Sequence, residues 1–127
     1  MTPADLATLL DEANHHPWES VQAALTAACG LSHPRLGWLV THLLNTKREY
    51  WALIAEVASV PVRPNDLTAL MTWEVGAARA LAPGTLALSV IHSGTTFTVA
   101  KLLRLNARHT TWHAGQIAAL AAALKTT

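Results

Sequence analysis

Residues 97–125 read FTVAKLLRLNARHTTWHAGQIAALAAALK and predict one long amphipathic helix. Residues 96–98 can cap its start, and apolar side chains recur at spacings of three and four up to about Leu124. The stripe expected to face the core contains Leu102, Asn106, His109, His113, Ile117, Leu120 and Leu124. Three consecutive positions of this stripe are polar, and burying each such group costs about 1–3 kcal/mol unless it finds a partner. The pattern indicates that these polar side chains have a role of their own.

His109 and His113 are four residues apart, so their side chains lie one above the other on a single helix face. Two imidazoles at this spacing can bind one metal ion through ring nitrogens, at about 2.0–2.1 Å. Thr110 follows His109, where the H-E-x-x-H motif of zinc proteases has its glutamate, so the pair does not belong to that motif. The pair alone is also compatible with two core histidines, and a third ligand would have to come from another helix.

The other five of the seven histidines compete for the third position. His42 lies at the edge of the apolar face of a predicted helix, from which it can point at a neighbouring helix. His15 and His16 lie at a bend in the chain, and His33 and His92 in predicted loops, where a surface position is the ordinary interpretation. Spacing alone leaves the third ligand open, with His42 as the main candidate.

The rest of the chain predicts three more helical elements joined by short connections. They are expected at residues 3–13 continued by 17–28 after a break at Pro17, at residues 34–58 and at residues 67–81. The β-branched run in residues 86–91 finds no partner strand elsewhere, so we interpret residues 83–95 as a structured crossover. The expected fold class is all-α: a four-helix bundle with a broken first helix, in one domain of residues 1–127.

Composition excludes several classes of protein. With 51% apolar and 13% charged residues the chain is not disordered, and its high apolar fraction favours a second buried surface such as a homodimer interface. A net charge of +1 without a basic stripe argues against nucleic-acid binding. We expect no signal peptide. We also expect no membrane-spanning helix, because no apolar run approaches the ~20 residues that a span needs. The single cysteine, Cys29, fits a reducing cytoplasm.

Several other residues have two plausible interpretations. Glu49 and Glu74 could act as a base or support a ligand, but we expect both on the solvated surface. Gln116 either supports His113 or a substrate, or faces solvent. Gly115 suggests close approach by another helix, because glycine costs about 1 kcal/mol inside a helix. Cys29 is interpreted as a small core residue, and the tryptophans as residues of the core or of a dimer interface.

Two segments are similar to motifs of a known family. Residues 37–44, GWLVTHLL, place an aromatic and apolar residues before His-Leu. Residues 97–103, FTVAKLL, lead into residues 109–117, HTTWHAGQI, which follow the pattern H-x-x-x-H-x-G-Q-I. With these motifs in this order, over most of its length, the chain resembles the DinB family, and the last motif is the specific one.

The resemblance implies a DinB-like four-helix bundle, commonly a homodimer, that holds one divalent metal ion such as zinc or nickel. Carried over residue by residue, the ligands are His42 of the second-helix motif and His109 and His113 of the last helix. The chain departs from the family pattern in its short length and broken first helix, which affects how a substrate pocket would be walled.

The function expected from this resemblance is a metal-dependent enzyme acting on a small molecule. Three neutral imidazoles leave the charge of the ion in place and a coordination position open, where water or a thiol becomes more acidic. Because some relatives transfer low-molecular-weight thiols, the expected reaction is that of a hydrolase or a thiol S-transferase. The alternative is a non-catalytic, dimeric helical-bundle module whose metal is structural or absent.

Overall fold

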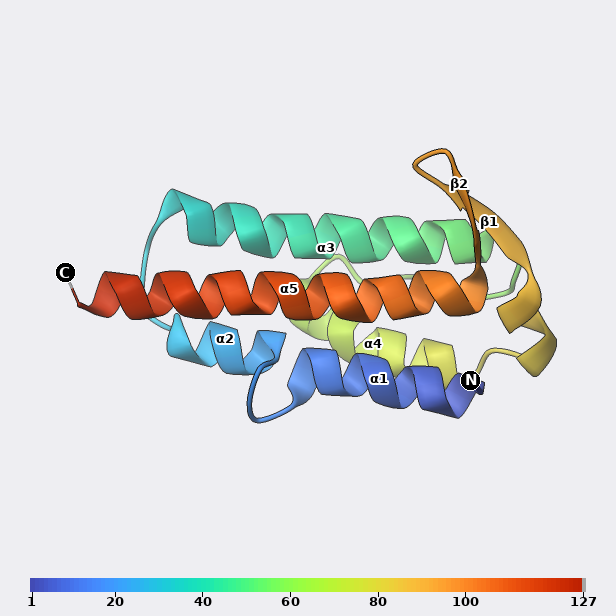
Figure 1. Cartoon of the computed structure of the whole chain (residues 1–127), viewed down its shortest axis with the longest axis horizontal. Coiled ribbons are helices and arrows are strands. Elements are labelled where there is room, and N and C mark those ends of the chain that lie inside the picture. The colour runs from blue at the N-terminus through green and yellow to red at the C-terminus, as the bar shows by residue number, and fades with distance from the viewer. Residues whose placement is uncertain (127) are drawn as a thin grey trace.

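The computed structural model describes residues 1–126, most of which lie in helices (Figure 1). The elements, in chain order, are α1 (Pro3–His15), α2 (Val21–Ala27), α3 (Pro34–Ala55), α4 (Leu67–Arg79), the short 3-10 helix η1 (Pro83–Ala87), β1 (Ser89–His92), β2 (Thr95–Thr98) and α5 (Val99–Lys125). The prediction of a mostly helical chain is confirmed, and the first helical element is indeed divided into two pieces, α1 and α2.

The long helix α5 organises the molecule (Figure 1). It packs against α3 on one side and against α1 and α2, which follow each other, on the other side. Helix α4 packs mainly against α1 and also contacts α3. Because α3 and α5 run side by side along most of their lengths, side chains at their facing edges can meet across the pair.

Side-chain caps set the helix starts and correct one prediction. Helix α2 begins at Val21 rather than at Pro17, because the Ser20 hydroxyl accepts a hydrogen bond from the amide of Ala23 at 3.1 Å. Helix α3 is capped by His33, whose Nδ1 accepts from the amide of Arg35 at 3.0 Å. The N-cap of α5 is Thr98, which lies within the residues 96–98 expected to cap this helix.

The interpretation of residues 83–95 as a crossover without strands is wrong. Strands β1 and β2 form an antiparallel hairpin in which Ser89 pairs with Thr98 and His92 with Thr95. The partner of the β-branched run therefore follows it directly, across a two-residue turn at Ser93 and Gly94. Both turn residues have positive φ, of 51° and 77°, which matches the twist of a tight hairpin.

The apolar core consists of two clusters along the molecule. One gathers around Leu6, Trp51 and Leu102, and the other around Leu39 and Ile117. None of the helices within residues 1–126 combines the length and the apolar character that crossing a bilayer requires.

Two expectations about small residues are wrong. Cys29 is exposed rather than in the core. Among the described residues, no other helix approaches Gly115 closely, because a Cβ added there would meet nothing within 4 Å.

Candidate metal centre

Helix α5 supplies two of the three histidines at the site. His109 and His113 lie on the edge of α5 that faces α3, and their Nε2 atoms are 3.0 Å apart. Both rings are partly buried. The spacing of four residues therefore brings the two rings together as the sequence predicts.

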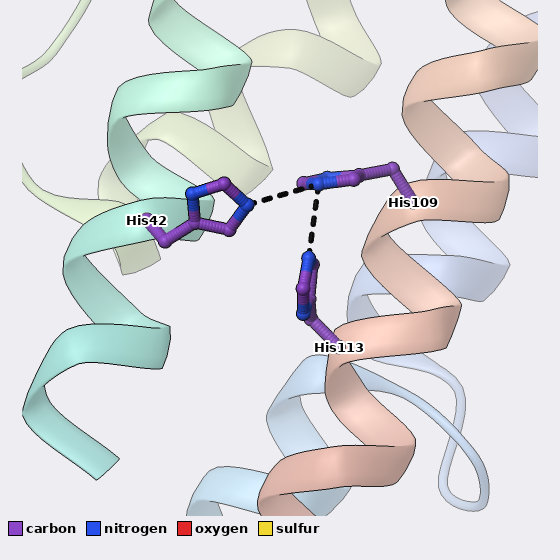
Figure 2. Close-up of side chains that lie close together, drawn as sticks. All are labelled: His42, His109 and His113. Carbon is purple, nitrogen blue, oxygen red and sulfur yellow. Dashed lines mark hydrogen bonds between the residues drawn. The ribbon is translucent and has the colours of Figure 1, made fainter. Parts of the chain in front are cut away.

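Helix α3 supplies the third histidine. His42 points across the α3–α5 interface, and its Nε2 lies 3.1 Å from Nε2 of His109 (Figure 2). One nitrogen from each of His42, His109 and His113 lies within 4.8 Å of the others. The structure thus brings together the three residues that the DinB resemblance selects.

The nitrogen separations suit a divalent metal ion. Two imidazole nitrogens bound to one zinc ion lie about 2.9 Å apart at a right angle and about 3.3 Å apart at the tetrahedral angle. The separations of 3.0 and 3.1 Å from His109 to its two neighbours fall within this range. A hydrogen bond can join only two ring nitrogens at a time, because a single proton lies between them. A metal ion can accept a lone pair from all three nitrogens, so their convergence favours a shared cation.

Gln116 orients the ring of His113. Its Oε1 lies 2.6 Å from Nδ1 of His113. Since the amide oxygen can only accept, Nδ1 carries the hydrogen and Nε2 keeps its lone pair directed at His42 and His109. Of the two interpretations of Gln116, support of a ligand is the one that the geometry favours.

His42 is oriented by stacking. The indole of Trp38 lies parallel to its imidazole, with an interplanar angle of 7° and ring centroids 4.8 Å apart. The guanidinium carbon of Arg35 lies 4.4 Å from the centroid of the same indole. These three residues follow one another at spacings of three and four along the edge of α3 that faces α5.

The surroundings favour the neutral form of His109 and His42. Burial, with the charges of His113, His42, Lys47 and His92, lowers the pKa of His109 from 6.5 to about 4. Burial, followed by the charges of His113 and Arg35, lowers the pKa of His42 in the same direction. Both rings therefore have a free lone pair at neutral pH, as metal binding requires.

The remaining histidines lie outside the triad. His15 pairs with Asp11 at 2.8 Å, His16 bonds the backbone of the α1–α2 loop, and His33 caps α3. His92 lies in β1 rather than in a loop, and its ring packs against Tyr50 with centroids 5.2 Å apart. Its Nδ1 is 3.7 Å from a carboxylate oxygen of Glu49, whose side chain is 61% exposed as expected.

A buried polar cluster lies beside the triad and was not predicted. Glu74, expected on the surface, is fully buried in α4, and Lys47 of α3 is 1% exposed. Glu74 Oε2 accepts from Lys47 Nζ and, at 2.6 Å, from Asn14 of α1. Glu74 Oε1 accepts from Trp51 at 3.0 Å and from Asn106 of α5 at 2.8 Å. This cluster joins all four principal helical elements.

The buried cluster also separates the two apolar clusters of the core. On α3, Lys47 lies between Leu43 of one cluster and Tyr50 of the other. Asn106 was correctly predicted as an inward polar residue, and Lys47 carried a similar signal, because it follows Leu43 by four residues on the apolar face. The charge of Lys47 hid that signal, since lysine is almost never buried unless it is paired.

The main cavities lie away from the triad. One, of about 610 Å³, is lined by residues of α1 and α5 together with Trp18 and Glu19. A neighbouring cavity, of about 460 Å³, also touches Trp18 and runs along α5 past Gly115. Neither of these two cavities is lined by His42, His109 or His113, which lie partly buried between α3 and α5.

No family model, curated protein or solved structure matches this chain. Its fold and site define it as a mostly helical protein with a three-histidine group placed to hold a metal ion.

Proposed function

We propose that the protein binds one divalent metal ion, zinc or nickel, through His42, His109 and His113. The observation that carries the proposal is the convergence of three Nε2 atoms from two helices, with separations of 3.0 and 3.1 Å from the central His109. All three donors are imidazoles, the ligand type shared by zinc and nickel sites.

We further propose that the site is catalytic. The ion, when bound, supplies a Lewis acid that makes water or a low-molecular-weight thiol acidic enough to act as a nucleophile, as in a hydrolase or a thiol S-transferase. The chain contributes orientation: Gln116 holds the ring of His113, and Trp38 stacks on His42. Three neutral ligands without a carboxylate leave the positive charge of the site undiminished, which favours this chemistry.

Membership of the DinB family is part of the proposal. It is supported by the H-x-x-x-H-x-G-Q-I motif in α5 and by the meeting of these two histidines with His42 of α3. Counting α1 and α2 as one broken helix leaves four principal helical elements, which supports the proposal of a DinB-type four-helix bundle. The exposed thiol of Cys29, the one cysteine of the chain, fits a reducing, cytoplasmic setting.

The metal proposal is tested by calorimetric titration with Zn²⁺ and Ni²⁺. Removing a supporting residue next to a ligand typically weakens metal binding 10–100-fold, so changing any one ligand to Ala should weaken it by more than about 100-fold. His15→Ala is the matched control, since His15 pairs with Asp11 on α1. Wild-type affinity in His42→Ala would rule out the three-histidine site.

The catalytic proposal is tested against the alternative of a structural metal. In the Co²⁺-loaded protein, an open coordination position should bind azide and change the visible absorption spectrum. An unchanged spectrum would favour the non-catalytic module, in which the ion has no position free for a substrate.

We also propose a homodimer formed through the outer face of α5. Trp112 on this face is 70% exposed and Trp18 beside it is 76% exposed, and large exposed aromatic side chains are typical of interfaces. Light scattering should give twice the 13.6 kDa mass of the chain. Trp112→Lys should give a monomer, whereas Val62→Lys, at a 93% exposed position, should remain dimeric.

A further inference from the structure

One edge of α3 presents a cation next to the metal ligands. Arg35 and His42 both lie over the indole of Trp38, at 4.4 and 4.8 Å from its centroid. Arg35 lies one helix turn before Trp38 and His42 lies one turn after it, so the indole lies between the guanidinium and the imidazole along α3. Arg35 is thereby held at a fixed place beside the triad.

The guanidinium of Arg35 has hydrogen-bonding capacity to spare. Arg35 is exposed, and within residues 1–126 its side chain forms no ion pair and no hydrogen bond, while its guanidinium carbon lies over the Trp38 ring. A guanidinium that stacks through its face keeps its N–H groups in the plane, directed outward. These donors match the geometry of a carboxylate.

Arg35 is the unpaired cation beside the triad within residues 1–126. Arg35, Lys47 and His92 are among the groups whose charges lower the pKa of His42 or His109. Glu49 lies on the far side of His92, 3.7 Å from its Nδ1, with a side chain that is 61% exposed. Glu74 is fully buried and paired with Lys47. Imidazole ligands add no negative charge to a metal centre, so a bound divalent ion would add its charge to that of Arg35.

We propose that the site takes an anionic small molecule whose carboxylate is held by Arg35 while its reacting group lies at the metal. This inference rests on the metal site proposed above and adds the class of substrate. Such a molecule must be long enough to pass the edge of Trp38, because the indole separates the guanidinium from His42. Arg35 then selects the substrate by charge, and Trp38 holds both Arg35 and His42 in place.

The test compares two probes that differ only in charge. Co²⁺-loaded protein is titrated with 6-mercaptohexanoate and with 6-mercaptohexan-1-ol, and the sulfur-to-cobalt absorption band reports the binding of each thiol. Because both probes offer the same thiol and chain, the ratio of their affinities isolates the carboxylate. Wild type should prefer the carboxylate by about tenfold, the effect expected of one charge-assisted hydrogen-bonded pair at an exposed site.

Variants of Arg35 assign this preference. Arg35→Gln should abolish it, although this variant should still bind Co²⁺ and the neutral thiol, and Arg35→Lys should retain part of it because charge remains without the planar fork. Arg79→Gln, at an exposed arginine at the end of α4, is the control and should keep the wild-type ratio.

The outcomes separate this proposal from the one on which it rests. Equal affinity of the two thiols in wild type would overturn the role of Arg35 and leave the metal site intact, as would a preference that survives Arg35→Gln. Failure of the protein to bind Co²⁺ through the triad would overturn the metal site, and the anion proposal with it.

Discussion

A histidine can serve as a metal ligand only if one ring nitrogen is deprotonated and directed at the ion, and neighbouring residues decide both conditions. Here each outer ligand has its own support. Gln116 accepts from Nδ1 of His113, and Trp38 stacks on the ring of His42. His109 lies between them and is kept neutral mainly by burial. The three ligands are thus supported by a hydrogen bond, by ring stacking and by burial, and the first two can be removed separately by substitution.

Removing the support of His113 should weaken metal binding without abolishing it. Gln116→Ala frees the ring to rotate and to change tautomer, so the affinity for Zn²⁺ should fall by about 10–100-fold in calorimetric titration. Gln116→Glu keeps an acceptor at the same place and should retain most of the affinity. Gln22→Ala, on the exposed surface of α2, is the control. Unchanged affinity in Gln116→Ala would show that the contact with His113 is incidental.

The low pKa of His109 predicts how the stability of the metal-free protein depends on pH. Unfolded histidine takes up a proton near pH 6.5, whereas folded His109 does so only near pH 4, so the unfolded state binds more protons within this window. The free energy of unfolding should therefore decrease as the pH is lowered from 6.5 towards 4, and His42 acts in the same direction.

This dependence is measured by urea unfolding of chelator-treated protein at a series of pH values between about 7 and 4. His109→Ala should show a flatter dependence than wild type, because the group that takes up the proton on unfolding is gone. A slope as steep in His109→Ala as in wild type would assign the acid sensitivity to other groups.

At the scale of elements, the glycines of α5 and of the β1–β2 hairpin differ in backbone conformation. Gly115 lies inside α5 with open space where a Cβ would be. Gly94 has the same open space, but its φ of 77° is one that other residues rarely adopt. The difference lies in the backbone and not in packing.

Alanine should therefore have opposite effects at these two positions. Gly115→Ala should raise the free energy of unfolding by about 0.5–1 kcal/mol, because alanine loses less backbone entropy in a helix. Gly94→Ala should lower it by about 1 kcal/mol through strain in the turn. Both are measured by urea unfolding. Destabilisation by Gly115→Ala would indicate that, in the proposed dimer, the second copy of the chain approaches Gly115 too closely for a methyl group.

At the scale of the whole molecule, the buried cluster around Glu74 determines how the helices pack against one another. A carboxylate that accepts hydrogen bonds from α1, α3 and α5 can be satisfied in only one relative placement of these helices. That placement also sets the facing edges of α3 and α5, where His42 meets His109. The polar cluster and the metal site are thus consequences of the same register.

Breaking the buried ion pair should destabilise the protein strongly. Glu74→Gln leaves the Lys47 ammonium buried without a counter-charge and should cost about 3–5 kcal/mol in urea unfolding. Adding Lys47→Met removes that ammonium, so the double variant should be less destabilised than the sum of the two single variants. Glu56→Gln, exposed at the end of α3, should change stability by less than about 0.5 kcal/mol. Strict additivity would contradict a coupled pair.

The amino-acid sequence by itself determined the helices and the local part of the site. Hydrophobic periodicity and capping residues act within a few residues, so the helices were predicted nearly as they occur, and the meeting of His109 with His113 followed from one helix turn. The hairpin was missed although its signal is also local, a Ser93-Gly94 turn between two β-branched runs.

Only the tertiary structure decided what depends on contacts between distant segments. His42 and His109 are 67 residues apart, and whether their nitrogens meet depends on the rotation and register of two helices, which spacing within either helix does not specify. The burial of Glu74 likewise depends on partners from three other helices. Sequence analysis predicts a charged residue at the surface, because burying an unpaired charge is energetically unfavourable. That cost is offset only by partners that the assembled fold provides.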